Sequence, residues 1–132
     1  MLRVGVSTMV YLGLTPSKAA ERILLRGFRS LELSYDNFLA SGVSELAELG
    51  RVADTVSRYS LDSLSVHLPY DRPPVSWPTL SRAIGRLSRW IRALDAVDAD
   101  YYVVHLPHLA PSGGSAELAS AYLLSLIHIS EP

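Results

Sequence analysis

The sequence predicts an α/β fold of the TIM-barrel type, in which this chain is a truncated fragment holding the first four βα units of an eight-unit barrel. Short apolar segments alternate with helical patterns, which favours a parallel sheet. One face of every predicted strand carries small or polar residues, which fits a barrel interior better than an open sheet covered by helices on both faces. An antiparallel sheet with one hydrated face is the alternative, and the helices between the strands argue against it.

Four segments have the length and alternation of β-strands. In chain order they are expected at Arg3 to Ser7, Ser30 to Ser34, Ser63 to His67 and Tyr101 to His105. Alternation directs Leu31 and Leu33 toward the covering helices and Glu32 toward the interior. By the same rule, His67 and His105 point inward from the last position of their strands.

Four helices are expected between and after the strands. The first begins at Pro16 behind an N-cap at Thr15 and ends near Gly27. Ser44 and Thr79 are the expected N-caps of the second and third helices, and the fourth starts at about Ser115. The segments after the strands, including YDNFLASGV at 35–43, are expected to be long loops that carry the functional site.

The composition indicates a globular domain with no pronounced charge. The chain has 132 residues, 48% of them hydrophobic, and its net charge is −1, so no overall attraction to nucleic acid or membrane surfaces is expected. The absence of cysteine excludes disulfides and thiolate metal sites. The sequence contains no long apolar run and no signal-peptide pattern at its start, so we expect a cytoplasmic protein with no membrane partner.

The last nine residues, LSLIHISEP at 124–132, match one reading frame of a transposon adapter used in sequencing libraries. We therefore interpret 124–132 as adapter read-through and 1–123 as the N-terminal half of the barrel. A native helix that continues into a strand is the alternative. On the adapter interpretation, His128 is not a ligand candidate, and the native residues beyond Leu123 are unknown.

A repeated tetrapeptide, VHLP, places His67 and His105 after two consecutive predicted strands. Because neighbouring strands lie about 4.8 Å apart, two such imidazoles can share one metal ion or bind two close ions. Glu32, on the same inward face, can orient a ligand or hold a substrate hydroxyl. The alternative is that each histidine is an ordinary strand-end residue bonded to a neighbour, and the repeat favours the functional interpretation.

Loop residues provide weaker candidates. Tyr70 and Trp77, in the loop expected after the third strand, can contact substrate, although plain packing explains them equally well. Asp36 and Asn37, after the second strand, have the same status. His108 is expected to be an ordinary loop residue.

The motifs VGVST, SLELSYD and the two VHLP segments together resemble the xylose-isomerase-like TIM barrels. The resemblance covers residues 1 to about 123 and implies a sugar or sugar-phosphate isomerase or epimerase that transfers a proton next to a carbonyl. It matches His67 and His105 to positions that bind zinc in the endonuclease branch and line the substrate and metal pocket in the isomerase branch. Glu32 matches the acidic residue often found on the second strand. The resemblance also implies a divalent metal (Mn²⁺, Mg²⁺, Co²⁺ or Zn²⁺) and places the general base in the four units that this sequence lacks.

The same superfamily includes DNA repair nucleases of the endonuclease-four type, which is the first alternative. A nuclease needs basic loops to hold a DNA backbone, and the predicted rim loops contain only Arg72, so nucleic acid is not the expected partner. A truncated fragment with no activity of its own is the second alternative. A homo-oligomer that covers the open sheet edges remains an untested option.

Overall fold

The structure, a computed structural model of the chain, describes residues 4–69, 77–105, 117 and 120–124. The chain forms two compact units. The first combines Met1–Leu68 with Ala93–Val103, and the second combines Pro69–Arg92 with Val104–Pro132. The sheet and its candidate site belong to the first unit.

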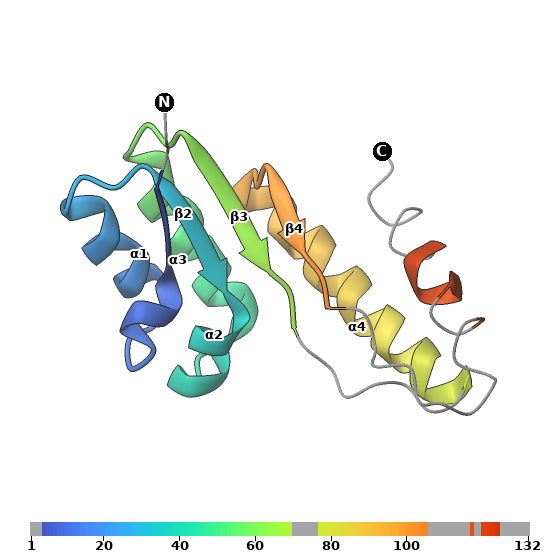
Figure 1. The fold of residues 1–132 in the computed structure, drawn as a ribbon. Coiled ribbons are helices and arrows are strands. Elements are labelled where there is room, and N and C mark those ends of the chain that lie inside the picture. Colours follow the sequence, from blue (N-terminus) through green and yellow to red (C-terminus); the bar gives the residue numbers. More distant parts are fainter. Residues whose placement is uncertain (1–3, 70–76, 106–116, 118–119, 125–132) are drawn as a thin grey trace. The chain divides into compact units, whose positions relative to one another are not determined.

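A four-stranded parallel sheet forms the centre of the first unit (Figure 1). Its strands, hydrogen-bonded in sequence order, are β1 (Gly5–Ser7), β2 (Ser30–Ser34), β3 (Ser63–His67) and β4 (Tyr101–Val103). All three neighbouring pairs are parallel. The expected α/β class with a parallel sheet is therefore confirmed.

Helix α1 (Pro16–Leu25) connects β1 to β2, and helix α3 (Glu45–Ser57) connects β2 to β3. The two helices pack against each other, and α1 also contacts β2. The apolar residues of β2 and β3 are buried, as alternation predicts, and so are the inner faces of both helices. This core comprises Ala19, Ala20, Ile23, Leu24, Leu31, Leu33, Leu49, Val52, Val56, Leu64 and Val66.

Helix α1 begins and ends where the sequence predicts. Thr15 is extended and Pro16 takes the first helical position, where a missing N–H costs nothing. Gly27, with φ of +91°, follows the last turn in the left-handed conformation that glycine adopts without strain. The Thr15 side chain, however, does not cap the helix.

The carboxylate of Glu48, on α3, caps α1 instead. Its Oε1 accepts hydrogen bonds from both the backbone N–H (2.8 Å) and the hydroxyl of Ser17. Its Oε2 accepts a bond of 3.0 Å from Arg51. Glu48 is only 1% exposed, and a negative charge at this helix end complements the helix dipole. One buried side chain therefore ties the start of α1 to α3.

Two segments expected as loops contain helical turns. The 3₁₀ helix η1 (Thr8–Tyr11) directly follows β1, and helix α2 (Tyr35–Ser41) directly follows β2. The prediction of a loop at 35–43 was therefore wrong. The Ser34 side chain caps α2 by accepting a bond from the N–H of Asp36, and Gly42, at φ +63°, ends it.

Buried polar groups hold the ends of β1 and β2 together. The Thr8 hydroxyl accepts a 2.9 Å bond from the N–H of Ser34. Asn37 is fully buried, and its Nδ2 donates to the carbonyls of Tyr11 and Leu14 at 3.1 and 3.3 Å. Asn37, considered above as a substrate contact, is thus structural in this geometry.

Strand β4 is shorter than expected, ending at Val103 instead of His105. Val103 pairs with His67, the last residue of β3, so the ladder ends where the partner strand ends. At the other end, Asp100 holds the register by two bonds. Its Oδ2 accepts from the N–H of Leu64 at 2.7 Å, and its N–H donates to the Leu64 carbonyl at 2.8 Å.

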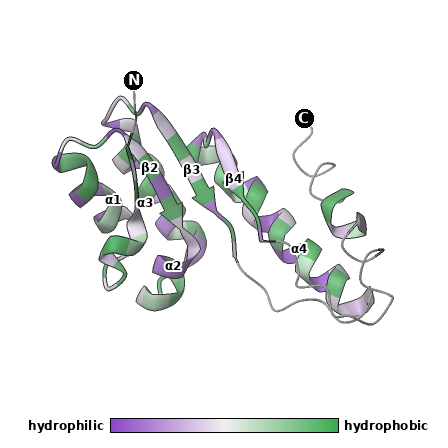
Figure 2. Cartoon of the chain, viewed as in Figure 1, coloured by the Kyte–Doolittle hydropathy of each residue, from purple (hydrophilic) through white to green (hydrophobic). Residues whose placement is uncertain are grey.

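Helix α4 (Trp77–Leu94) belongs to the second unit as far as Arg92. It begins two residues before its expected N-cap, Thr79, and hydrophobic and hydrophilic residues share its length (Figure 2). Several of its apolar residues are buried, including Leu80, Leu87 and Ile91. Beyond β4, the described residues 117 and 120–124 are helical, consistent with a fourth helix. None of the helices in the described part of the chain is long and apolar enough to cross a membrane.

We predict that Glu48→Gln lowers the free energy of unfolding by about 1–3 kcal/mol, because it weakens three charge-assisted hydrogen bonds in a buried position. Urea unfolding at neutral pH measures the loss. Asp54→Asn, which removes an exposed carboxylate from the same helix, is the matched control and should change stability by less than about 0.5 kcal/mol. Equal effects of the two substitutions would contradict the capping role.

We also predict that this stabilisation is lost in acid. Burial raises the pKa of Glu48, but the hydrogen bonds from Ser17 and Arg51, with a smaller contribution from nearby Thr15, outweigh it and leave the pKa below its ordinary value. Since the folded pKa is lower than the unfolded one, the contribution is complete above the unfolded value, about 4.3, and disappears as the pH falls through the folded value. The stability difference between wild type and Glu48→Gln should therefore shrink toward zero in urea titrations below about pH 4. A difference that is independent of pH would refute this assignment.

Candidate functional site

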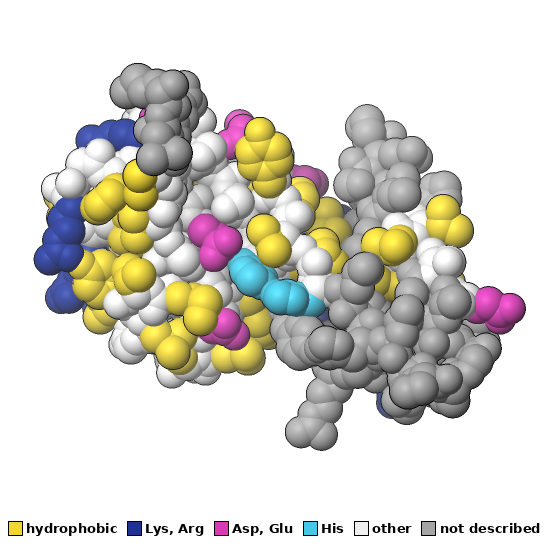
Figure 3. Space-filling model, viewed as in Figure 1, with side chains coloured by type: hydrophobic (Ala, Val, Ile, Leu, Met, Phe, Trp, Pro, Cys, Tyr) yellow, Lys and Arg dark blue, Asp and Glu magenta, His cyan; other side chains and the backbone are white. Residues whose placement is uncertain are grey.

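The face of the sheet opposite the α1–α3 core contains a hollow of about 270 Å³. It is lined by Gly5, Ser7, Ser30, Leu31, Glu32, Ser63 and Ser65. These residues come from β1, β2 and β3, and most of them are small and neutral. Figure 3 shows mainly uncharged side chains on this face, with an acidic side chain beside a histidine.

The strand register explains why the hollow exists. Ser7 pairs with Glu32, and Glu32 pairs with Ser65, so these three side chains form one row on one face. Gly5, Ser30 and Ser63 form the row before it. Five of these six residues are glycine or serine, and their small side chains leave space above the sheet. The small, polar face predicted from alternation is therefore observed on β1, β2 and β3, whereas the same face of β4 carries Tyr101 and Val103.

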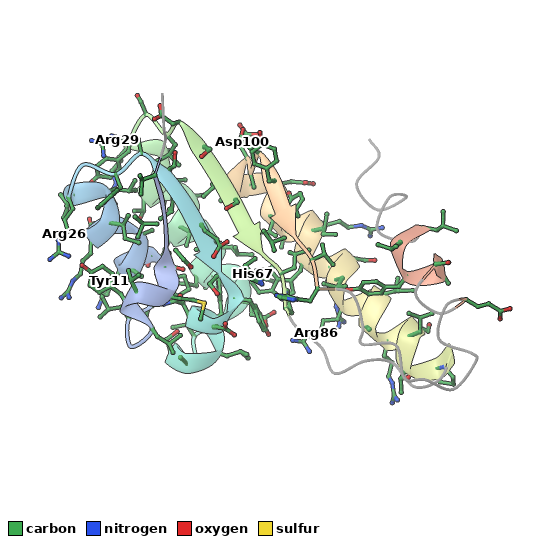
Figure 4. The ribbon with its side chains drawn as sticks, viewed as in Figure 1. Tyr11, Arg26, Arg29, His67, Arg86 and Asp100 are labelled. Atoms are coloured by element: carbon green, nitrogen blue, oxygen red, sulfur yellow. The ribbon has the colours of Figure 1, made fainter. Side chains whose placement is uncertain are left out.

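Glu32 and His67 meet at the edge of the hollow nearer the carboxyl ends of the strands. The His67 Nδ1 lies 3.8 Å from the Glu32 Oε1, and the two side chains are 25% and 30% exposed. His67 is the last residue of β3, as Figure 4 shows, and it pairs with Ser34, two residues beyond Glu32. The distance allows an ion pair when the imidazole is protonated, and it is longer than a hydrogen bond.

His105 is not at the register position of His67. Val103 occupies that position, and His105 follows it by two residues, beyond the end of β4. His105 is exposed and belongs to the second unit. The prediction that the two imidazoles share a metal therefore remains a prediction.

The other residues considered above as substrate or ligand contacts lie at the limits of the described residues or outside them. Tyr70 and His108 lie outside them, as does the adapter-like segment from 125 onward. Trp77 is the first residue of α4, and the structure does not describe its side chain. Of the three predicted substrate-binding residues, only Glu32 is placed in the hollow.

The described residues do not make a metal site by themselves. No group of three or more His, Asp or Glu side chains with the spacing of a metal site occurs among them. A catalytic zinc site usually takes three ligands from the protein, whereas Glu32 and His67 supply two. The pair can contribute to a metal site only together with further ligands.

The sequence predicts the polar face of the sheet, but it does not predict that the serines line a hollow or that Tyr101 lies next to them. Tyr101 pairs with Ser65 and is 65% exposed. The signal for its placement was available in the alternation of β4, but the register between β3 and β4 is fixed by long-range contacts such as the Asp100–Leu64 pair. Its alignment with Ser65 therefore follows only from the structure.

Comparison with known protein families and with curated proteins gives no match for this chain. The family resemblance of the motifs therefore has no independent support from these comparisons. The functional argument depends on the geometry of the sheet face.

We predict that Glu32→Gln changes the free energy of unfolding by less than about 1 kcal/mol, because within the described residues its partly exposed carboxylate has one long contact, to His67. The same substitution at Glu48 is the internal comparison, since that carboxylate is buried and accepts three hydrogen bonds. Urea unfolding of both variants under one set of conditions tests the contrast. A loss at Glu32 as large as that at Glu48 would make Glu32 a structural residue.

Proposed function

We propose that this chain is the N-terminal half of a xylose-isomerase-like TIM barrel, and that the polar sheet face forms part of the sugar-binding interior of an isomerase or epimerase. The observation that carries the proposal is the meeting of Glu32 and His67 beside the hollow. The proposed reaction is proton transfer next to the carbonyl of a sugar or sugar phosphate.

The sheet topology supports the barrel part of the proposal. Crossovers between parallel strands are almost always right-handed, so strands added in sequence order place successive helices on the same face. The opposite face is then enclosed when the sheet curls into a cylinder. The order β1-β2-β3-β4 and the small residues on the open face both fit such a cylinder.

The chemistry of the hollow supports a polyhydroxylated substrate. Each serine hydroxyl can donate one hydrogen bond and accept others, and the Glu32 carboxylate can accept from sugar hydroxyls. His67, with one nitrogen directed to Glu32, can hold or transfer a proton at a substrate oxygen or carbon. The expected dependence on Mn²⁺, Mg²⁺, Co²⁺ or Zn²⁺ would require additional ligands, which the described residues do not provide.

The charge of the lining also favours the proposed isomerase over a repair nuclease. Among the described residues around the hollow, Glu32 is the only charged one, and none is Lys or Arg. A phosphodiester backbone is normally held by cationic side chains. The charge of the hollow therefore favours the isomerase branch of the resemblance.

We predict that Mn²⁺ added to the ¹⁵N-labelled chain broadens the amide resonances of the hollow, including Glu32 and Ser65, because Glu32 and His67 offer a carboxylate and an imidazole on one side of it. His67→Ala and Glu32→Gln should each reduce the broadening, and His105→Ala tests whether the second imidazole shares the ion. Asp54→Asn, an exposed carboxylate on α3, is the control and should leave the broadening unchanged.

Broadening that is confined to other surface carboxylates, or that survives His67→Ala unchanged, would refute the metal-binding part of the proposal. The coding sequence beyond Leu123 provides the second test. If a longer gene is found and its following strands place no Glu, Asp or His on the inner face, the proposed isomerase is rejected. If such residues are present, aldose–ketose interconversion by the complete protein, lost on Glu32→Gln, would support it.

A further inference from the structure

We propose that the hollow binds the neutral, hydroxyl-rich part of a sugar, and that Tyr101 is the specificity-determining residue on which this part stacks. The inference rests on the proposed function and narrows its substrate. It limits the ligand of the hollow to a neutral, hydroxyl-rich group with no phosphate near Glu32. It also assigns ligand stacking to Tyr101, a residue that the sequence did not single out.

The lining has the hydrogen-bonding groups of a polyol site. Four serines, Ser7, Ser30, Ser63 and Ser65, line the space, and each serine hydroxyl can both donate and accept, as a sugar hydroxyl does. The Glu32 carboxylate only accepts, so it pairs with hydroxyl donors. A neutral polyol can therefore satisfy the whole lining without placing a charge in it.

A phosphate group does not fit the same lining. Glu32 is the one charged residue among the described lining residues, so a phosphate dianion would meet a like charge at close range. Repulsion between unit charges at a few ångströms is substantial at a protein surface. The hollow should therefore discriminate against a phosphate and accept a neutral hydroxylated chain or ring.

Tyr101 does not line the hollow itself, but its register places it beside the lining residue Ser65. Ser65 pairs with Glu32 on one side and with Tyr101 on the other, so all three side chains lie in one row on the same face. Two strand spacings separate Glu32 from Tyr101, roughly 10 Å. At that spacing, a sugar ring above Ser65 could meet the carboxylate at one edge and the aromatic ring at the other.

The exposure of Tyr101 also suits a ligand contact. Its side chain is 65% exposed, whereas Tyr102, the next residue, faces the opposite side of the sheet and is only partly exposed. Burial, together with Asp95 and Asp98, raises the pKa of Tyr102. An aromatic ring has a negatively polarised face, which attracts the weakly positive C–H groups along one side of a sugar. Tyr101 therefore offers a stacking surface beside the hydroxyls of the hollow.

The test uses the ¹⁵N-labelled chain without added metal and a matched pair of unreactive probes, D-sorbitol and D-sorbitol 6-phosphate. We expect sorbitol to shift the amide signals of Ser30, Glu32 and Ser65, and the phosphate ester to bind at least about tenfold more weakly. Glu32→Gln should reduce that difference. Tyr101→Ala should weaken sorbitol binding about fivefold, whereas Tyr101→Phe, which keeps the ring, should stay within about twofold of wild type.

Tyr102→Phe is the control on the opposite face and should not change sorbitol binding. Equal affinity for the two probes would overturn the charge assignment, and unchanged binding in Tyr101→Ala would overturn the stacking role. If Tyr101→Ala fails to fold, the charge assignment is decided by the wild-type comparison of the two probes, and Tyr101→Phe still tests whether the ring suffices. Because no metal is present, sorbitol binding without Mn²⁺ binding would reject only the metal-binding part of the proposed function, and Mn²⁺ binding without sorbitol binding would reject this inference alone.

Discussion

The register between the parallel strands is the constraint on which the rest of the structure depends. In a sheet, a shift of one residue moves every side chain of a strand to the other face. The pairing of Ser7, Glu32 and Ser65 keeps the small and acidic residues on one side, and it keeps Leu31, Leu33, Leu64 and Val66 in the core on the other. The hollow and the hydrophobic core are therefore two results of the same alignment.

Side chains at the ends of the strands maintain that alignment. Thr8 binds the backbone of Ser34 where β1 and β2 end, and Asp100 binds the backbone of Leu64 where β3 and β4 begin. On the helical side, Glu48 joins the first turn of α1 to α3. Each contact joins residues 26 or more positions apart in the sequence. They fix the positions of elements whose local sequences only favour a strand or a helix.

Local patterns predicted what local physics determines. The limits of β2 and β3, the start of α1 at Pro16 and its end before Gly27 follow from alternation, proline and glycine, and all were correct. Helix α2 was missed because YDNFLAS follows a strand directly, and Ser34, read as a strand residue, also serves as the N-cap. The end of β4 was misplaced because its length depends on the partner strand. The Glu48 cap could not be predicted, since nothing in the local sequence relates it to Ser17.

The candidate site shows the same difference between what the local sequence determines and what long-range contacts determine. Alternation alone placed Glu32 and His67 on one face, and the structure brings them to 3.8 Å. The repeat of VHLP suggested that His67 and His105 are equivalent, but the register aligns His67 with Val103. A repeated motif describes the order of residues along each strand, whereas the stagger between strands depends on contacts elsewhere in the fold.

The size of the residue at position 5 in β1 affects the depth of the hollow, because Gly5 is one of its lining residues. A Cβ added at Gly5 would lie 3.6 Å from the Cβ of Ser30, which is ordinary van der Waals contact, and β1 is extended there. Alanine at this position would therefore occupy space without moving the backbone. Larger side chains at position 5 would leave progressively less room in the hollow. A series of substitutions there would therefore measure the size of the largest molecule that the hollow admits.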